Sequence, residues 1–191
     1  KLVENGEIRS AIFWGPPGVG KTTLARVIAK VSEADFVELS GVVSGKEDLM
    51  KAVDRAEQNK RLGIRTVLFI DEIHRWNKAQ QDALLPSVER GVVILIGATT
   101  ENPSFEIIGA LLSRSRVFVL PALSETHIIE IVKRTLADVE RGYGSKQIEI
   151  ADEVLELLAQ LSGGDARIAL GGLEFAVSSK TGQAKKKITL T

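Results

Sequence analysis

Short apolar runs alternate with amphipathic stretches over residues 10–120. The stretches between the runs, such as KTTLARVIAKVSEA, repeat apolar residues at the spacing of one face of a helix. The runs are short and rich in β-branched residues, as strands are, and they span residues 10–14, 36–39, 66–70, 92–100 and 116–120. Continuous runs of this kind, separated by helices, predict parallel strands that are covered on both faces. We therefore predict an α/β fold with a five-stranded parallel sheet covered by helices.

The pattern changes after Pro121. Three helical segments follow, SETHIIEIVKRTLADVER, ADEVLELLAQLS and DARIALGGLEFAVSSK, with only the short run IEI between the first two. We predict an α/β domain over residues 1–120 and a small helical lid domain over residues 121–191. The last segment, TGQAKKKITLT, is interpreted as a strand or a frayed tail. Within the first domain, Pro86 is expected to kink or shorten the helix predicted over 78–91.

Composition and charge narrow the class of protein without identifying a partner. Hydrophobic residues make up 44% and charged residues 26%, which is typical of a soluble globular protein. Lys plus Arg and Asp plus Glu both number 25, so bulk charge does not favour nucleic acid. The chain has no cysteine, which excludes disulfides and thiolate metal sites. The apolar runs are shorter than the ~18 residues that span a bilayer, so no membrane partner is expected.

The string GPPGVGKT, residues 15–22, matches the phosphate-binding pattern G-x-x-x-x-G-K-[ST] between a predicted strand and a predicted helix. Lys21 can reach the β- and γ-phosphates of a nucleotide, and the Thr22 hydroxyl can ligate Mg²⁺. A purely structural Gly/Pro turn would not require Lys and Thr at these positions. The residues predicted to bind the nucleotide are Gly15, Pro16, Pro17, Gly18, Val19, Gly20, Lys21, Thr22 and Thr23.

The string TVLFIDEIH supplies two carboxylates at the end of a buried strand. Asp71 would hold Mg²⁺ directly or through water, and Glu72 suits a general base that accepts a proton from the attacking water. The alternative is that both residues only cap the following helix, and the phosphate loop in the same chain disfavours it. His74 completes the pattern D-E-x-H, but a lone histidine is more often structural, so we assign it no catalytic role.

These motifs form an ordered set with GATT after the fourth strand, then LLSR, then GGDAR in the helical region. The set resembles the AAA+ ATPases, P-loop NTPases, in their clamp-loader-like branch. It is most similar to the RarA/MgsA family (replication-associated recombination protein A, whose eukaryotic counterpart is the Werner-helicase-interacting protein). The similarity runs from about Ile12 to Val177. The strings that carry it are FWGPPGVGKTTLARVIA, DEIHRWNKAQQDALLPSVERG, IGATTENPSFEIIGALLSRSRVF and GGDARIALGGLE.

The resemblance implies roles for further residues. Thr100 matches sensor 1, whose hydroxyl contacts the γ-phosphate or the attacking water, and Asn102 is a weaker candidate. Arg114 matches the arginine finger, which reaches the γ-phosphate bound in a neighbouring subunit. Arg167 matches sensor 2, which contacts the γ-phosphate of its own subunit from the lid. Ser40 is a weak candidate for a polar partner that holds Glu72 away from water until DNA binds.

Each arginine also has a plainer interpretation. Cations are favoured at helix C-termini, which accounts well for Arg116 and less well for Arg114. Arg167 follows Asp165, a typical N-terminal cap, so it could be a surface residue of the third lid helix.

A DNA-binding surface is not visible in the sequence. Trp76, which follows Arg75, is the one aromatic residue next to a basic residue that suggests stacking on bases. DNA binding is therefore implied by the resemblance alone. The basic residues that could meet DNA are scattered: Lys46, Lys60, Arg61, Arg65, Arg75, Lys78 and the run Lys185–Lys187.

The resemblance implies a DNA-dependent ATPase that acts at stalled replication forks in replication-coupled recombination and repair. It implies ATP and Mg²⁺, hydrolysis at the interfaces of a homo-oligomer, and DNA with single-stranded ends, gaps or forks as partner. Single-strand-binding protein and replisome components are further candidate partners. The location would be cytoplasmic, at the bacterial nucleoid, or nuclear in a eukaryote.

Two alternatives stay open: a clamp-loader subunit and a Holliday-junction motor of the RuvB type. LLSR lacks the cysteine that follows it in clamp loaders, and RuvB-type motors share GATT but not ENPSFE. The segment that helps to enclose adenine and the family's oligomerisation region are missing, so we expect an excised ATPase core that hydrolyses ATP poorly unless it assembles.

Overall fold

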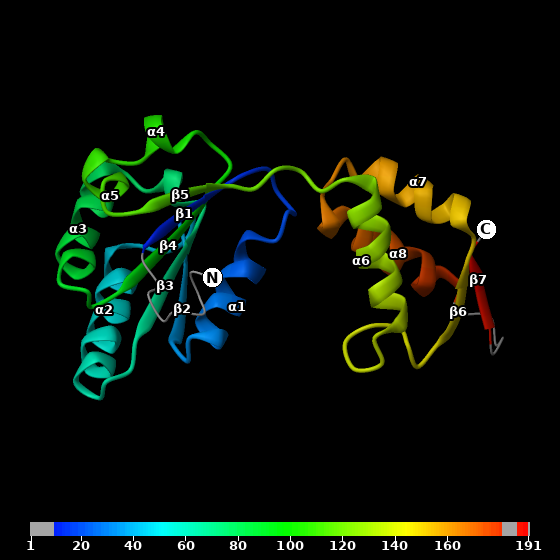
Figure 1. Cartoon of the computed structure of the whole chain (residues 1–191), viewed down its shortest axis with the longest axis horizontal. Helices are drawn as coiled ribbons and strands as arrows, with labels where there is room; N and C mark the ends of the chain where they lie inside the picture. The colour runs from blue at the N-terminus through cyan, green and yellow to red at the C-terminus, as the bar shows by residue number, and fades with distance from the viewer. Residues whose placement is uncertain (1–9, 181–186, 191) are drawn as a thin grey trace. The chain divides into compact units, whose positions relative to one another are not determined.

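The computed structural model describes residues 10–180 and 187–190 (Figure 1). Two compact units meet in sequence between Leu120 and Pro121, and the four loop residues Pro16–Val19 group with the second unit. Among the described residues, no helix combines the length and the apolar character needed to cross a membrane.

The first unit is built on a five-stranded parallel sheet, which confirms the predicted fold class. Its order is β2-β3-β4-β1-β5, so each chain crossover places a helix against one face. The strands are β1 (Ala11–Trp14), β2 (Asp35–Ser40), β3 (Thr66–Asp71), β4 (Ile94–Thr99) and β5 (Arg116–Val119). The helices are α1 (Lys21–Val31), α2 (Lys46–Arg61), the 3₁₀ turn η1 (Ile73–Arg75), α3 (Lys78–Glu89), α4 (Pro103–Glu106) and α5 (Gly109–Leu112).

The inner strand β3 explains why the apolar runs are continuous. Leu68 belongs to a core cluster that includes Leu49 of α2, whereas Phe69 belongs to a second cluster that includes Ala25 of α1. Successive side chains of a strand point to opposite faces, so a strand between two helical layers needs apolar residues at every position.

Two local expectations were wrong. β5 was expected to be covered on both faces, but all four of its residues are exposed because the strand lies at the edge of the sheet. Pro86 does not shorten its helix, because α3 continues to Glu89; the alternative expectation, a kink at Pro86, stays a prediction. Proline removes a hydrogen bond to the preceding turn, but the apolar face of α3 still packs through Leu84.

The second unit contains the three predicted helices, α6 (Glu125–Ala137), α7 (Asp152–Ser162) and α8 (Ala166–Lys180). Ile128, Leu155 and Leu173 are buried together where the three helices meet. The run IEI lies in β6 (Gln147–Ile150), which pairs in parallel with β7 (Lys187–Leu190). The end of the chain therefore contains a strand, while residues 181–186 and 191 lie outside the described residues.

The start of β2 is joined to α2 by a charged pair that makes stability depend on pH. Arg55 donates to both carboxylate oxygens of Asp35 at 2.7 and 2.6 Å, and Asn59 donates at 2.7 Å. Burial acts to raise the pKa of Asp35, but the hydrogen bonds from Arg55 and Asn59 outweigh it and lower that pKa below its usual value. A lowered carboxyl pKa stabilises the fold above the unfolded-state pKa, and the contribution is lost as the pH falls through the folded-state pKa.

Replacing Asp35 with asparagine is therefore expected to lower the free energy of unfolding by about 1 kcal/mol at pH 7. The difference from wild type should shrink as the pH falls from about 3.9, the usual pKa of an aspartate, through the lower pKa of Asp35 in the folded protein. Urea unfolding at a series of pH values measures it, and a difference that persists undiminished in acid would contradict the assignment.

Candidate functional site

The carboxyl ends of neighbouring strands converge on one edge of the sheet. Trp14 at the end of β1 lies in register beside Thr99 of β4, and Ser40 of β2 lies beside Asp71 of β3. The phosphate loop follows β1, and Glu72 follows β3 directly. Ligands of open parallel sheets bind outside the carboxyl ends of the strands, so this edge is the place to expect a site.

The phosphate loop has the backbone that its glycines predict. Gly18 and Gly20 have φ angles of +69° and +92°, which residues with a side chain rarely adopt. Gly15 is packed so closely that a Cβ there would lie 2.1 Å from the carbonyl oxygen of Leu120. Lys21 begins α1 and is buried, and its Nζ donates a hydrogen bond of 2.7 Å to the carbonyl oxygen of Gly15.

The residues around this loop suit a magnesium nucleotide. Thr22 lies in the first turn of α1 and Asp71 ends β3, and both side chains are half-buried. Mg²⁺ is typically held by one or two protein oxygens together with phosphate oxygens, rather than by a cage of carboxylates. Among the described residues there is no group of three or more His, Cys, Asp or Glu side chains that could hold a metal ion. The other predicted nucleotide-binding residues are in the same loop and turn: Pro16, Pro17, Val19 and Thr23.

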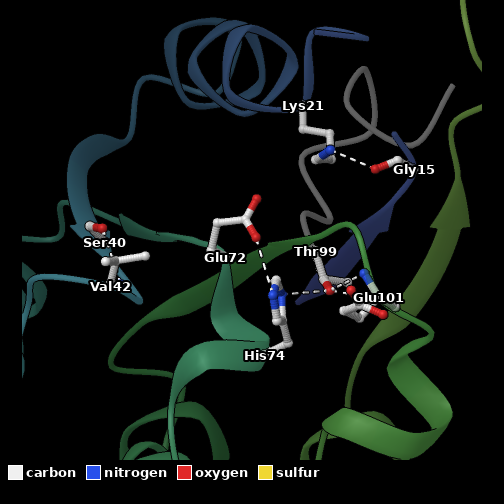
Figure 2. Close-up of polar contacts among 8 residues, drawn as sticks. All are labelled: Gly15, Lys21, Ser40, Val42, Glu72, His74, Thr99 and Glu101. Atoms are coloured by element: carbon white, nitrogen blue, oxygen red, sulfur yellow. Dashed lines mark hydrogen bonds and ion pairs between the residues drawn. The ribbon is translucent and has the colours of Figure 1, made fainter. Parts of the chain in front are cut away.

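Glu72 has an unusual backbone and a well-defined partner. Its φ and ψ are 53° and 44°, the left-handed region that is strained for a residue with a side chain. The turn of η1 that follows brings His74 back toward it, and the carboxylate oxygen lies 3.2 Å from His74 Nε2. The other ring nitrogen, Nδ1, lies 3.0 Å from the hydroxyl of Thr99 (Figure 2).

Sequence reasoning missed this connection. It gave His74 no role and selected Thr100 rather than Thr99. Thr99 is fully buried at the end of β4, whereas Thr100 lies one residue beyond the strand and is half-buried. The spacing D-E-x-H was the available signal, because the tight turn that begins at Ile73 folds His74, two residues after Glu72, back beside the carboxylate.

Two weaker candidates have local partners. The Ser40 hydroxyl accepts the backbone N–H of Val42 at 3.2 Å, while Glu72 pairs with His74 (Figure 2). Asn102 accepts the backbone N–H of Ser104 at 3.0 Å and so caps α4.

The two candidate arginines occupy exposed helix ends. Arg114 follows α5, where it pairs with Glu89 at 2.6 Å and donates to the carbonyl oxygen of Ala110 at 2.9 Å. Arg167 lies in the first turn of α8, and its backbone N–H donates to Asp165 at 2.8 Å, so the predicted cap is present. The structure thus gives the local setting of each arginine, and their action on a nucleotide stays a prediction.

The basic residues considered for DNA are spread over several elements. Trp76 is only 3% exposed, so it is a core residue and is not available to stack on bases as placed. Lys60 donates to the carbonyl oxygen of Arg90 at 2.6 Å and Arg65 to that of Ser32 at 2.7 Å, which gives both side chains local structural roles. Lys185 and Lys186 lie outside the described residues.

Comparison with known proteins identifies the family. The sequence model described as "ATPase family associated with various cellular activities (AAA)" matches residues 11–122, which include the phosphate loop, Asp71, Glu72 and Arg114. The chain belongs to the AAA family of ATPases. A second model, the "AAA C-terminal domain", matches residues 144–191. The predictions of an AAA-type fold and of an ATP-hydrolysing class of enzyme are thereby confirmed.

Relatives within the AAA family confirm the predicted resemblance. Replication-associated recombination protein A of Escherichia coli K12 is 51% identical over 175 residues, covering 92% of this chain and 39% of the relative. ATPase WRNIP1 of Dictyostelium discoideum is 45% identical over 179 residues, covering 94% of this chain and 20% of the relative. The chain therefore spans less than half the length of these relatives.

A solved structure also resembles this AAA chain. The RuvB Holliday junction branch migration motor of Thermotoga maritima aligns with a TM-score of 0.76 and 30% identity. The alignment covers 98% of this chain and 60% of that one.

Replacing Gly41 with alanine is expected to displace the backbone of Glu72. The Gly41 N–H donates to the carbonyl oxygen of Asp71 at 2.6 Å, and a Cβ on Gly41 would lie 2.1 Å from the carbonyl oxygen of Glu72. Overpacking of this kind lowers the free energy of unfolding by about 1–3 kcal/mol. We expect that loss in urea unfolding, together with slower ATP hydrolysis.

Gly45→Ala is the matched control, because a Cβ at Gly45 meets no atom within 4 Å. Equal effects of the two substitutions would contradict a close packing of Gly41 against Glu72.

Proposed function

We propose that the protein is a DNA-dependent ATPase that acts at stalled replication forks in replication-coupled recombination and repair. The observation that carries the proposal is the convergence of the phosphate loop, Asp71 and Glu72 at one sheet edge, in a chain 51% identical to a replication-associated recombination protein. The likeness to the RuvB Holliday junction branch migration motor supports action on DNA as well.

The first part of the mechanism is the binding of ATP. The loop backbone and Lys21 hold the β- and γ-phosphates, and Lys21 leaves the carbonyl oxygen of Gly15 to do so. Thr22 and Asp71 hold Mg²⁺, which neutralises phosphate charge when it is bound. Thr100 contacts the γ-phosphate or the attacking water.

Hydrolysis then depends on a group that accepts a proton and on groups that stabilise the negative charge of the transition state. Glu72 accepts a proton from water as the water oxygen bonds to the γ-phosphorus and the bond to the bridging oxygen breaks. Arg114 of a neighbouring subunit and Arg167 of the same subunit stabilise negative charge on the γ-phosphoryl oxygens. The catalytic unit is therefore an interface of a homo-oligomer, formed by the full-length protein.

The partners follow from this role. We propose DNA with single-stranded ends, gaps or forks as the stimulating ligand, and single-strand-binding protein or replisome components as protein partners. The protein would act at the bacterial nucleoid, or in the nucleus of a eukaryote.

ATP hydrolysis by the full-length protein on a set of DNA structures tests the proposal. We expect forked or gapped DNA to raise kcat more than blunt duplex does. Stimulation by a four-way junction alone would instead favour a RuvB-type motor. Stimulation that requires a sliding clamp would favour a clamp-loader subunit. A rate that no DNA changes would overturn the proposal.

A further inference from the structure

A chain of hydrogen bonds connects the phosphate loop to the candidate base. Lys21 Nζ donates to the carbonyl oxygen of Gly15, and the Gly15 N–H donates to the carbonyl oxygen of Thr99 at 3.1 Å. The Thr99 hydroxyl then meets His74 Nδ1, and His74 Nε2 meets the Glu72 carboxylate (Figure 2). The side chain of His74 therefore connects β4 with the residue after β3. We call the set of contacts among Thr99, His74 and Glu72 the bridge.

The groups at the two ends of this chain limit its possible hydrogen-bond roles. An ionised carboxylate only accepts, so His74 Nε2 carries a proton and donates it to Glu72. In the neutral ring Nδ1 is then an acceptor. The Thr99 hydroxyl has two acceptors within reach, His74 Nδ1 at 3.0 Å and the carbonyl oxygen of Glu101 at 3.2 Å, and it donates its single hydrogen to one of them at a time. The Thr99 oxygen in turn accepts the backbone N–H of Glu101 at 3.0 Å. Both ring nitrogens of His74 thus lie within hydrogen-bonding distance of a polar side chain.

The three members of the bridge differ in how deeply they are buried. The side chain of His74 is 8% exposed and Thr99 is fully buried, whereas the side chain of Glu72 is 32% exposed. The buried side chains of His74 and Thr99 therefore hold the more exposed carboxylate of Glu72. A histidine that served packing alone would not need both ring nitrogens aimed at polar side chains, one on β4 and one in the residue after β3.

We propose that His74 is a positioning residue that orients the Glu72 carboxylate toward the attacking water and takes its own orientation from Thr99. This inference rests on the proposed ATPase function and adds two residues to it. Because Thr99 precedes the predicted sensor Thr100 and bonds the phosphate loop, the bridge also ties the base to the strand that meets the γ-phosphate.

Kinetics of full-length variants test the bridge. His74→Ala and Thr99→Val each remove one of its members, and a misplacement of a catalytic group by about 1 Å lowers rates up to ~10²-fold. We therefore expect kcat to fall by about 10- to 100-fold in both variants, with the Kd of a fluorescent ATP analogue unchanged. His74→Gln keeps a donor for Glu72, so its kcat should fall less than that of His74→Ala. Thr99→Ser keeps the hydroxyl, so its kcat should fall less than that of Thr99→Val.

Double variants separate positioning from a general effect on folding. Adding His74→Ala to Glu72→Gln should cause no further loss, since residues that act as a unit are not additive. His127→Ala is the matched control, because the chain has two histidines and His127 lies in the exposed cap of α6. We expect wild-type kcat from that control.

The outcomes distinguish the inference from the function on which it rests. If wild type hydrolyses ATP and Glu72→Gln does not, a wild-type or raised kcat in His74→Ala overturns the positioning role alone. Losses that are fully additive with Glu72→Gln, or that lie only in ATP affinity, also overturn it. If Glu72→Gln hydrolyses ATP as wild type does, the proposed mechanism of hydrolysis fails as well.

Discussion

Replacing Arg114 with alanine in the full-length protein is expected to lower the kcat of ATP hydrolysis by about 10³- to 10⁵-fold, the usual effect of an arginine finger. Negative charge spreads over the γ-phosphoryl oxygens in the transition state, and a planar guanidinium matches them with two donors. In the structure Arg114 is exposed and pairs with Glu89 and Ala110 of its own chain. An exposed pair of this kind is weak, so a neighbour's nucleotide can displace it.

Arg116→Ala is the control for this substitution. Arg116 is also an exposed arginine, two residues further on, but it begins β5 and its backbone N–H bonds the carbonyl oxygen of Ser10. The backbone bond survives the substitution, so kcat should stay near that of wild type. Equal losses in the two variants would mean that general charge, rather than a finger, explains the effect of Arg114.

The second large effect is expected for Glu72→Gln. The amide cannot accept the proton of the attacking water, and loss of a general base costs about 10²- to 10⁴-fold in rate. The phosphate loop and Asp71 are unchanged, so the variant should still bind ATP and retain it. Rapid-quench measurement of γ-phosphate release, beside equilibrium ATP binding, separates the two steps. Loss of binding in parallel with hydrolysis would contradict the assignment of Glu72 as base.

Mixing the two variants tests the shared interface. A Glu72→Gln subunit has a working finger, and an Arg114→Ala subunit has a working base. Some interfaces of a mixed oligomer then contain both, so activity should reappear on mixing. A mixture as inactive as its components would show that Arg114 does not act on a neighbour's nucleotide.

The sheet and the phosphate loop were predictable because their signals are local. A strand buried on both faces must be apolar at every position, as Leu68 and Phe69 of β3 are. Gly18 and Gly20 belong to the local motif of the phosphate loop, and both have the positive φ that glycine tolerates. Both patterns can be recognised without knowing what lies nearby in space.

The errors concern contacts between distant segments. β5 resembles the buried strands in composition, but its place at the sheet edge depends on the order of all five strands. Trp76 lies beside an arginine in sequence, yet the fold buries its ring. The partner of His74 on β4 is 25 residues away, so no spacing rule could join Thr99 to Glu72.

The left-handed backbone at Glu72 has a consequence for the history of this position. Asn and Gly adopt that conformation more readily than Glu does, by roughly 1 kcal/mol. Selection for a stable fold alone would therefore favour replacement of Glu72 by Asn or Gly. Each such replacement would leave a folded protein without its general base. A glutamate in this conformation is the outcome expected where selection for turnover outweighs selection for stability. Descendants that have lost hydrolysis but still bind nucleotide should carry Asn or Gly at this position more often than Ala.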